Sequence, residues 1–241
     1  MSERYEKQVY LAMLAEQCSR FEDMMEFLVD MVKGKKDDLS SDERNLLSIA
    51  YKNTISLRRQ ALRTLLAYET KEKKKGDDSA YLPYILEYKK KIESELASLC
   101  QKIIKNIDTH LLTKATDAEA KVFYHKMKAD YYRYIAENMD ENGKKEFAEN
   151  SKKSYEDAMS ISKELTISNP IRLGLALNFS VFYYEVLNSQ STACDIAKET
   201  LDLAKKELAN VDEDDEEHKD AFAIINLLQE NLNMWTMEND N

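Results

Sequence analysis

Apolar residues recur along most of this chain at the three- and four-residue spacing of an amphipathic helix. In the first segment, Val9, Leu11, Leu14, Ala15 and Cys18 supply these apolar positions. The 241 residues include only 4 glycines and 2 prolines, so few positions favour a tight turn. The pattern predicts nine helices, at about 3–18, 20–34, 40–72, 83–112, 116–142, 144–166, 170–188, 191–209 and 217–236.

Short polar motifs mark several of the helix boundaries. Residues 40–43 and 116–119 each place a hydroxyl three positions before a glutamate, the pattern of a capping box. Asn169–Pro170 combines a cap residue with proline at the first helical position. Asn142–Gly143 predicts the end of the helix that begins near residue 116. Long helices with short links favour an all-α fold of antiparallel neighbours.

Composition limits the class of protein. The net charge of -10 argues against general nucleic-acid binding. Three widely spaced cysteines, Cys18, Cys100 and Cys194, favour a reducing intracellular compartment. The charged N-terminus has no apolar segment typical of a signal peptide, and no apolar run approaches the roughly 18 residues of a membrane span. We expect a soluble cytoplasmic protein that can also occur in the nucleus and that does not bind membranes.

The helix around residues 126–137 has charged residues where an amphipathic helix would have apolar ones. Lys126 and Arg133 are seven residues apart and share a face. Asp130 and Glu137 each follow one of these bases by four residues, so each is expected to hold its base in place. Tyr134 lies at the edge of the same stripe.

A second cationic stripe lies on the helix at 40–72, where Lys52, Arg59 and Arg63 are spaced by seven and four residues. Either stripe alone fits a solvated face with ordinary ion pairs. If the two helices pack side by side, however, the cations would converge and repel one another unless an anion filled the site. Guanidinium groups suit phosphate oxygens, so a phosphate site is the functional interpretation.

Two later helices each place an asparagine among large apolar residues. One carries Leu177, Asn178, Val181 and Glu185 on one side, and the other carries Leu227, Asn231, Met234 and Trp235. A buried carboxamide is costly unless it is hydrogen-bonded. Each asparagine therefore either bonds a neighbouring helix or bonds the backbone of an extended peptide as donor and acceptor.

Three long strings carry a resemblance to a known family. They are R-N-L-L-S-I-A-Y-K-N at 44–53, K-V-F-Y-H-K-M-K-A-D-Y-Y-R-Y-I-A-E at 121–137, and P-I-R-L-G-L-A-L-N-F-S-V-F-Y-Y-E at 170–185. At these residues the chain resembles the 14-3-3 family, and the similarity spans nearly its whole length. The resemblance implies a nine-helix subunit of a cup-shaped dimer, with an amphipathic groove for phosphoserine or phosphothreonine peptides. It implies no catalytic activity and no cofactor or metal.

The resemblance also assigns residues to three sites. The phosphate would be held by Lys52, Arg59, Arg133 and Tyr134. The rest of the peptide would contact Lys126, Leu177, Asn178, Val181, Glu185, Leu227, Asn231, Met234 and Trp235. The dimer interface would join Leu14, Cys18, Arg20 and Asp23 to Leu65, Tyr88, Lys91 and Glu95 of the partner, pairing Arg20 with Glu95 and Asp23 with Lys91.

The resulting prediction is one helical domain over 1–236. Helices in 1–112 would serve dimerisation and one side of the phosphate site, 113–236 would complete the groove, and 237–241 would form a short acidic tail. The expected partners are phosphorylated client proteins and a second subunit, either identical or a paralogue. An alternative is a tetratricopeptide-like scaffold for unmodified peptides, although no fixed repeat is visible. An enzyme is disfavoured, since His110, His125 and His218 have no metal-ligand spacing and no glycine-rich phosphate loop occurs.

Overall fold

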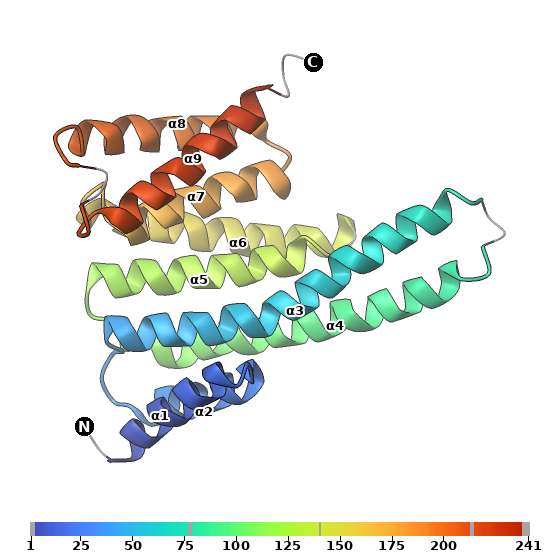
Figure 1. Cartoon of the computed structure of the whole chain (residues 1–241), viewed down its shortest axis with the longest axis horizontal. Helices are drawn as coiled ribbons and strands as arrows, with labels where there is room; N and C mark the ends of the chain where they lie inside the picture. The colour runs from blue at the N-terminus through green and yellow to red at the C-terminus, as the bar shows by residue number, and fades with distance from the viewer. Residues whose placement is uncertain (1–2, 77–78, 140, 213–214, 238–241) are drawn as a thin grey trace. The chain divides into compact units, whose positions relative to one another are not determined.

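The computed structural model describes residues 3–76, 79–139, 141–212 and 215–237. Over these residues it contains nine α-helices and no strand, which confirms the all-α prediction (Figure 1). The helices are α1 (Glu3–Gln17), α2 (Phe21–Gly34), α3 (Ser41–Lys73), α4 (Leu82–Asn106), α5 (Ala118–Ala136), α6 (Glu141–Ile161), α7 (Pro170–Glu185), α8 (Gln190–Glu207) and α9 (Lys219–Met237). None of the described helices combines the length and apolar character that crossing a bilayer requires. Four of the five tail residues, 238–241, lie outside the described part of the chain.

The chain divides into two compact units, Met1–Ala115 and Thr116–Asn241. In the first unit, α1 packs along α2, α2 packs on α3, and α3 pairs with α4 as a long hairpin (Figure 1). In the second unit, α5 pairs with α6, α7 pairs with α8, and α9 packs on both α7 and α8. Contacts of α5 and α6 with α7 join the two helix pairs of the second unit to each other.

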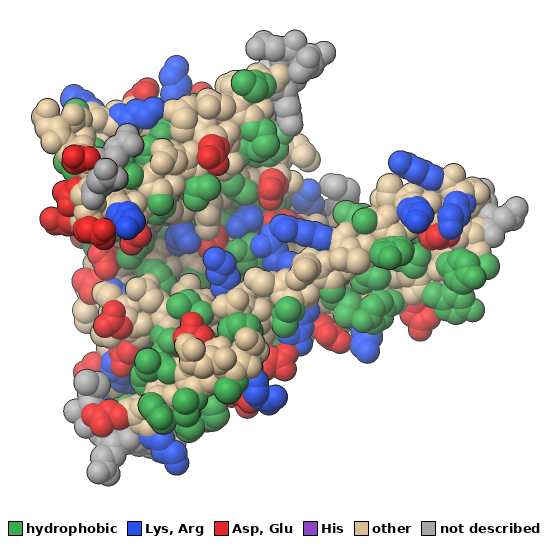
Figure 2. Space-filling model, in the orientation of Figure 1, with side chains coloured by type: hydrophobic (Ala, Val, Ile, Leu, Met, Phe, Trp, Pro, Cys, Tyr) green, Lys and Arg blue, Asp and Glu red, His purple; other side chains and the backbone are tan. Residues whose placement is uncertain are grey.

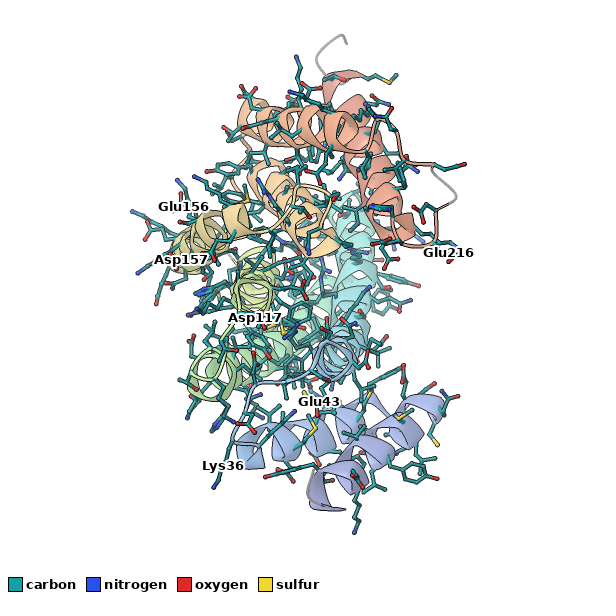
Figure 3. The ribbon with its side chains drawn as sticks, turned by 90° about the vertical axis from the view of Figure 1, so that its left-hand side faces the viewer. Lys36, Glu43, Asp117, Glu156, Asp157 and Glu216 are labelled. Atoms are coloured by element: carbon teal, nitrogen blue, oxygen red, sulfur yellow. The ribbon has the colours of Figure 1, made fainter. Side chains whose placement is uncertain are left out.

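The predicted capping box at residues 40–43 is confirmed. The Glu43 amide donates to Ser40 Oγ at 3.3 Å, and the Ser40 amide donates to Glu43 Oε2 at 2.8 Å. Two of the amides that lack partners at the start of α3 are therefore satisfied reciprocally. Figure 3 labels Glu43 at this end of the helix. Asn169 likewise caps α7, where its Oδ1 accepts from the amides of Ile171 and Arg172.

Two boundary predictions around α5 are wrong. The cap of α5 is Asp117, whose carboxylate accepts from the Ala120 amide at 2.6 Å, so residues 116–119 do not form a capping box (Figure 3). A carboxylate is as good an N-cap as a hydroxyl, and Asp117 caps the helix one residue later than the predicted box would have done. The helix then ends at Ala136, and residues 142–143 lie in the first turn of α6. Amides in a first turn have no intrahelical partner, so glycine there need not stop a helix.

The end of α4 shows a feature that the sequence pattern did not predict. Residues Ile107–Leu111 continue α4 as a short π-helical turn. Both end residues of this turn are buried, so the altered winding keeps apolar side chains in the core of the first unit. Apolar spacing alone cannot distinguish this turn from regular α-helix.

Candidate functional site

The charged face of α5 has the ion pairs that its spacing predicts. Lys126 Nζ lies 3.1 Å from Asp130 Oδ2, and Arg133 Nη1 lies 2.7 Å from Glu137 Oε1. Asp130 and Arg133 are buried, whereas Lys126 and Glu137 are half-buried. The two carboxylates therefore fix the two bases along one side of the helix.

Asp130 is the centre of a hydrogen-bond network within the second unit. It accepts from the Tyr155 hydroxyl at 2.5 Å and from Asn178 Nδ2 at 2.9 and 3.0 Å. Burial by itself would raise the pKa of this carboxyl, but Lys126, Arg133 and the Tyr155 hydrogen bond outweigh it and lower the pKa. Asp130 is therefore ionised near neutral pH.

Arg133 is only 6% exposed, yet it keeps its charge. Its Nε donates to the Tyr155 hydroxyl at 3.2 Å, and its guanidinium carbon lies 4.7 Å from the centre of the Tyr134 ring. Desolvation would lower the pKa of Arg133, but the neighbouring tyrosines and the carboxylates Asp130 and Glu137 raise it well above its usual value. The result is a cation held in one orientation by groups on α5 and α6.

The other cationic stripe lies in the first unit, on α3. Lys52 and Arg63 are exposed and Arg59 is half-buried. Lys52 and Arg59 thus belong to one unit, whereas Arg133 and Tyr134 belong to the other. Their joint use for one phosphate stays a prediction.

The two asparagines differ in their surroundings. Asn178 Nδ2 donates to the carboxylate of Asp130 on α5 and lies within hydrogen-bond distance of both its oxygens, as expected for an asparagine that bonds a neighbouring helix. Asn231 on α9 is half-buried. Because Asn178 donates to Asp130, its Oδ1 is the atom best suited to bind a peptide, as an acceptor.

The residues predicted to form the apolar wall lie on α7 and α9. Leu227 and Met234 are exposed, and Leu177 and Val181 are half-buried. Trp235, in contrast, is 1% exposed and stacks on Tyr184 with ring centres 4.8 Å apart. The indole thus supports the packing of α9 on α7, and direct contact with a peptide is not available to it in this conformation. Glu185 is exposed at the end of α7.

The predicted dimer residues all lie in the first unit. Leu14, Cys18, Tyr88 and Lys91 are exposed, whereas Leu65 is half-buried. Arg20 bonds Asp23 within the same chain, and Glu95 Oε2 lies 3.9 Å from Arg58 Nε. Three of the four charges predicted to pair between subunits therefore already have partners inside one chain.

Tyr155 is the residue of this network that the sequence analysis missed. It lies on α6, 22 residues from Arg133 and 25 from Asp130, so helical spacing gives no signal for the contact. Its burial could be expected, since a tyrosine within an apolar pattern packs in a core. The partners of its hydroxyl depend on how α5 and α6 pack. Among the described residues there is no group of histidine, cysteine or acidic side chains that could hold a metal ion.

Comparison with known proteins identifies the class. A family model described as "14-3-3 protein" matches residues 11–236. The 14-3-3-like protein GF14-F of Oryza sativa subsp. japonica is 48% identical over 236 residues, covering 97% of this chain and 90% of that protein. The 14-3-3-like protein A of Hordeum vulgare is 48% identical, covering 97% and 89%, and a 14-3-3-like protein of Solanum tuberosum is 46% identical, covering 99% and 92%.

These matches and the all-helical fold define a regulatory adaptor of the phosphopeptide-binding type. The chain belongs to the 14-3-3 family. Proteins of this family are non-catalytic adaptors that bind client proteins and dimerise. The tetratricopeptide-like alternative is disfavoured.

Proposed function

We propose that this chain binds client proteins only when a serine or threonine of the client is phosphorylated. Lys52, Arg59, Arg133 and Tyr134 hold the phosphate in this proposal. The observation that carries it is the buried network in which Tyr155, Glu137 and Asp130 keep Arg133 charged and oriented. A guanidinium fixed before the ligand arrives loses little side-chain freedom on binding, and its donors match phosphate oxygens.

The remaining peptide contacts follow from the same groove. Lys126 and Glu185 lie at its polar side, and Asn178 and Asn231 bind peptide backbone. Leu177, Val181, Leu227 and Met234 contact apolar side chains of the client, with Trp235 supporting them from beneath. Two exposed apolar residues on α9, Leu227 and Met234, support this division.

The proposal has further parts that concern partners and location. The subunit dimerises through the first unit, with an identical copy or a paralogue. It has no catalytic activity and no cofactor, and it binds neither nucleic acid nor membrane. It acts in the cytoplasm and also in the nucleus.

Fluorescence polarisation of a phosphoserine peptide and its unphosphorylated twin tests the main claim. We expect only the phosphorylated peptide to bind, and Lys52→Glu or Arg59→Glu to abolish binding while the circular dichroism spectrum stays unchanged. Lys198→Glu on α8 is the matched charge reversal, since Lys198 is exposed and outside the proposed site. Equal affinity for the two peptides would contradict the proposal and favour a scaffold for unmodified peptides.

A further inference from the structure

A cavity of about 470 Å³ lies in the first unit, around Met25, Val29, Ile103 and Asn106. We call it the α2–α4 cavity. Figure 2 shows hydrophobic side chains gathered over the free end of the α3–α4 hairpin, which is assigned to the dimer, but the cavity is a separate feature. The residues predicted to bind phosphate, peptide or a second subunit all lie in the described part of the chain, and none of them lines the cavity. Its volume is within the range of small-molecule sites in proteins.

Helical spacing brings together the apolar part of the cavity wall. Met25 and Val29 are four residues apart on α2, and Ile103 of α4 lines the same cavity. Both α2 residues are half-buried, so part of each apolar side chain is accessible to a ligand. Methionine sulfur makes favourable contacts with aromatic rings, and its flexible side chain adapts to their shape. This wall therefore suits an aromatic group.

The wall also holds a buried carboxamide with only one of its two groups hydrogen-bonded. Asn106 is 7% exposed, and its Nδ2 donates to the hydroxyl of Tyr51 at 2.6 Å. Its Oδ1 is buried and has no hydrogen-bond partner among the described residues. A buried acceptor without a donor is unfavourable, and a ligand with an N–H or O–H group would relieve that penalty. Because the bond to Tyr51 holds the carboxamide in place, little ordering is needed on binding.

The π-helical turn at Ile107–Leu111 forms one part of the cavity wall. The Leu112 amide donates to the Ile107 carbonyl, five residues back, at 2.9 Å. Asn106 directly precedes this turn, and Thr109 and His110 within it also line the cavity. Short π-helical turns inside α-helices occur frequently at functional sites. The turn is thus an indication of a ligand site that is independent of the unpartnered oxygen.

The charged groups around the cavity nearly balance. Exposed side chains of both signs line it, namely Lys33, Lys102, Lys105, Glu26 and Asp30. Lys33 Nζ lies 3.8 Å from Asp30 Oδ1, so part of this charge is already paired. A surface with both signs interspersed favours neither a strongly anionic nor a strongly cationic ligand. Recognition therefore depends on the apolar wall and on Asn106 Oδ1.

We propose that the α2–α4 cavity binds a small, uncharged aromatic molecule that donates an N–H or O–H group to Asn106 Oδ1. The ring packs against Met25, Val29 and Ile103. This site goes beyond the proposed phosphopeptide binding and does not depend on it.

Indole and N-methylindole test the proposal as a pair, because they have similar shapes and only indole has an N–H donor. Titration of the isotope-labelled full chain, followed by NMR, gives a Kd for each compound and locates it on the chain. We expect indole to shift the amide signals of α2 and of the π-helical turn, and to bind about tenfold more tightly than N-methylindole. Asn106→Leu should remove this preference for indole.

Val29→Phe fills the cavity without touching the carboxamide, and it should abolish binding of both compounds. Leu203→Phe on α8 is the matched control, since it places the same ring at an exposed apolar position outside the cavity and should change neither Kd. Circular dichroism confirms that each variant is folded.

Three results would overturn this inference. Binding of indole that is unchanged in folded Val29→Phe, or shifts confined to other helices, would place the compound outside the cavity. Equal affinities of the wild type for indole and N-methylindole would leave Asn106 Oδ1 without a role in recognition. Signals that do not saturate with either compound would remove the site altogether. None of these results bears on binding of a phosphoserine peptide, so the two proposals fail separately.

Discussion

The Tyr155 hydroxyl joins two oppositely charged groups at the centre of the second unit. It accepts from Arg133 Nε and donates to Asp130, and its ring stacks on Phe179 with centres 5.1 Å apart. Burial, followed by the charge of Asp130, raises the pKa of Tyr155 well above its usual value, so the phenol stays protonated. A neutral hydroxyl can serve both neighbours at once, and we infer that it positions Arg133 for the phosphate.

Tyr155→Phe should weaken binding of a phosphoserine peptide about tenfold, because one donor and one acceptor in a buried site lose their partner. The ring packing is kept, so the fold should persist. If the hydroxyl acts through the guanidinium, Tyr155→Phe should have little further effect in an Arg133→Lys background. Fluorescence polarisation of the two single variants and the double variant measures this coupling.

Tyr183→Phe is the control for that cycle. Tyr183 lies beside Phe179, with ring centres 4.9 Å apart, but within the described residues its hydroxyl bonds neither Arg133 nor Asp130. If the losses of binding free energy for Tyr155→Phe and Arg133→Lys simply add in the double variant, the hydroxyl stabilises the fold without orienting the arginine.

Among the helical elements, the α3–α4 hairpin is stabilised by Lys73 and Lys89, which both donate to the buried carboxylate of Glu69. The hydrogen bonds from Lys73 and then Lys89 lower the pKa of Glu69 below its usual range. A group with a lowered folded-state pKa stabilises the fold above its unfolded pKa, near 4.3 for glutamate. That contribution is lost as the pH falls through the folded-state value.

Glu69→Gln should therefore lower the Tm at pH 7, and the difference from wild type should shrink as the pH falls below about 4. Differential scanning calorimetry at pH 7, 5, 4 and 3 follows both proteins. Glu87→Gln, at an exposed position on α4, should leave the Tm unchanged throughout. A difference between Glu69→Gln and wild type that is the same at every pH would show that packing, and not the charge, is what Glu69 provides.

The boundaries of the helices were predictable where a short sequence motif specified them. The capping box at Ser40 and the Asn169–Pro170 start placed two helices within a residue of where they begin. The break between α5 and α6, which lies between Ala136 and Glu141, was predicted too late in the chain. The pair Asn142–Gly143 is compatible with the first turn of a helix as well as with a helix end. The π-helical turn at Ile107–Leu111 was invisible, since its apolar spacing also fits α-helix.

For the whole molecule, the sequence predicted which charges share a helix face but not which groups meet across helices. Lys126–Asp130 and Arg133–Glu137 follow from four-residue spacing. The links from Asp130 to Asn178 and to Tyr155 depend on the packing of α5 against α6 and α7. The family resemblance supplied residue roles that spacing alone could not, including the assignment of Lys52 and Arg59 to the site of Arg133.

The assignment of one phosphate to residues of both units makes a prediction for the whole chain. Hydrogen exchange with and without a saturating phosphoserine peptide should show added protection in α3 around Lys52–Arg59 and in α5 around Arg133. Binding stabilises only those states in which all the ligand's contacts are formed, so both segments must open less often when the ligand is bound. The unphosphorylated peptide should protect neither segment, and Lys52→Glu should abolish both effects together. Protection confined to α5 and its neighbours in the second unit would show that Arg133 binds the phosphate without the α3 cations.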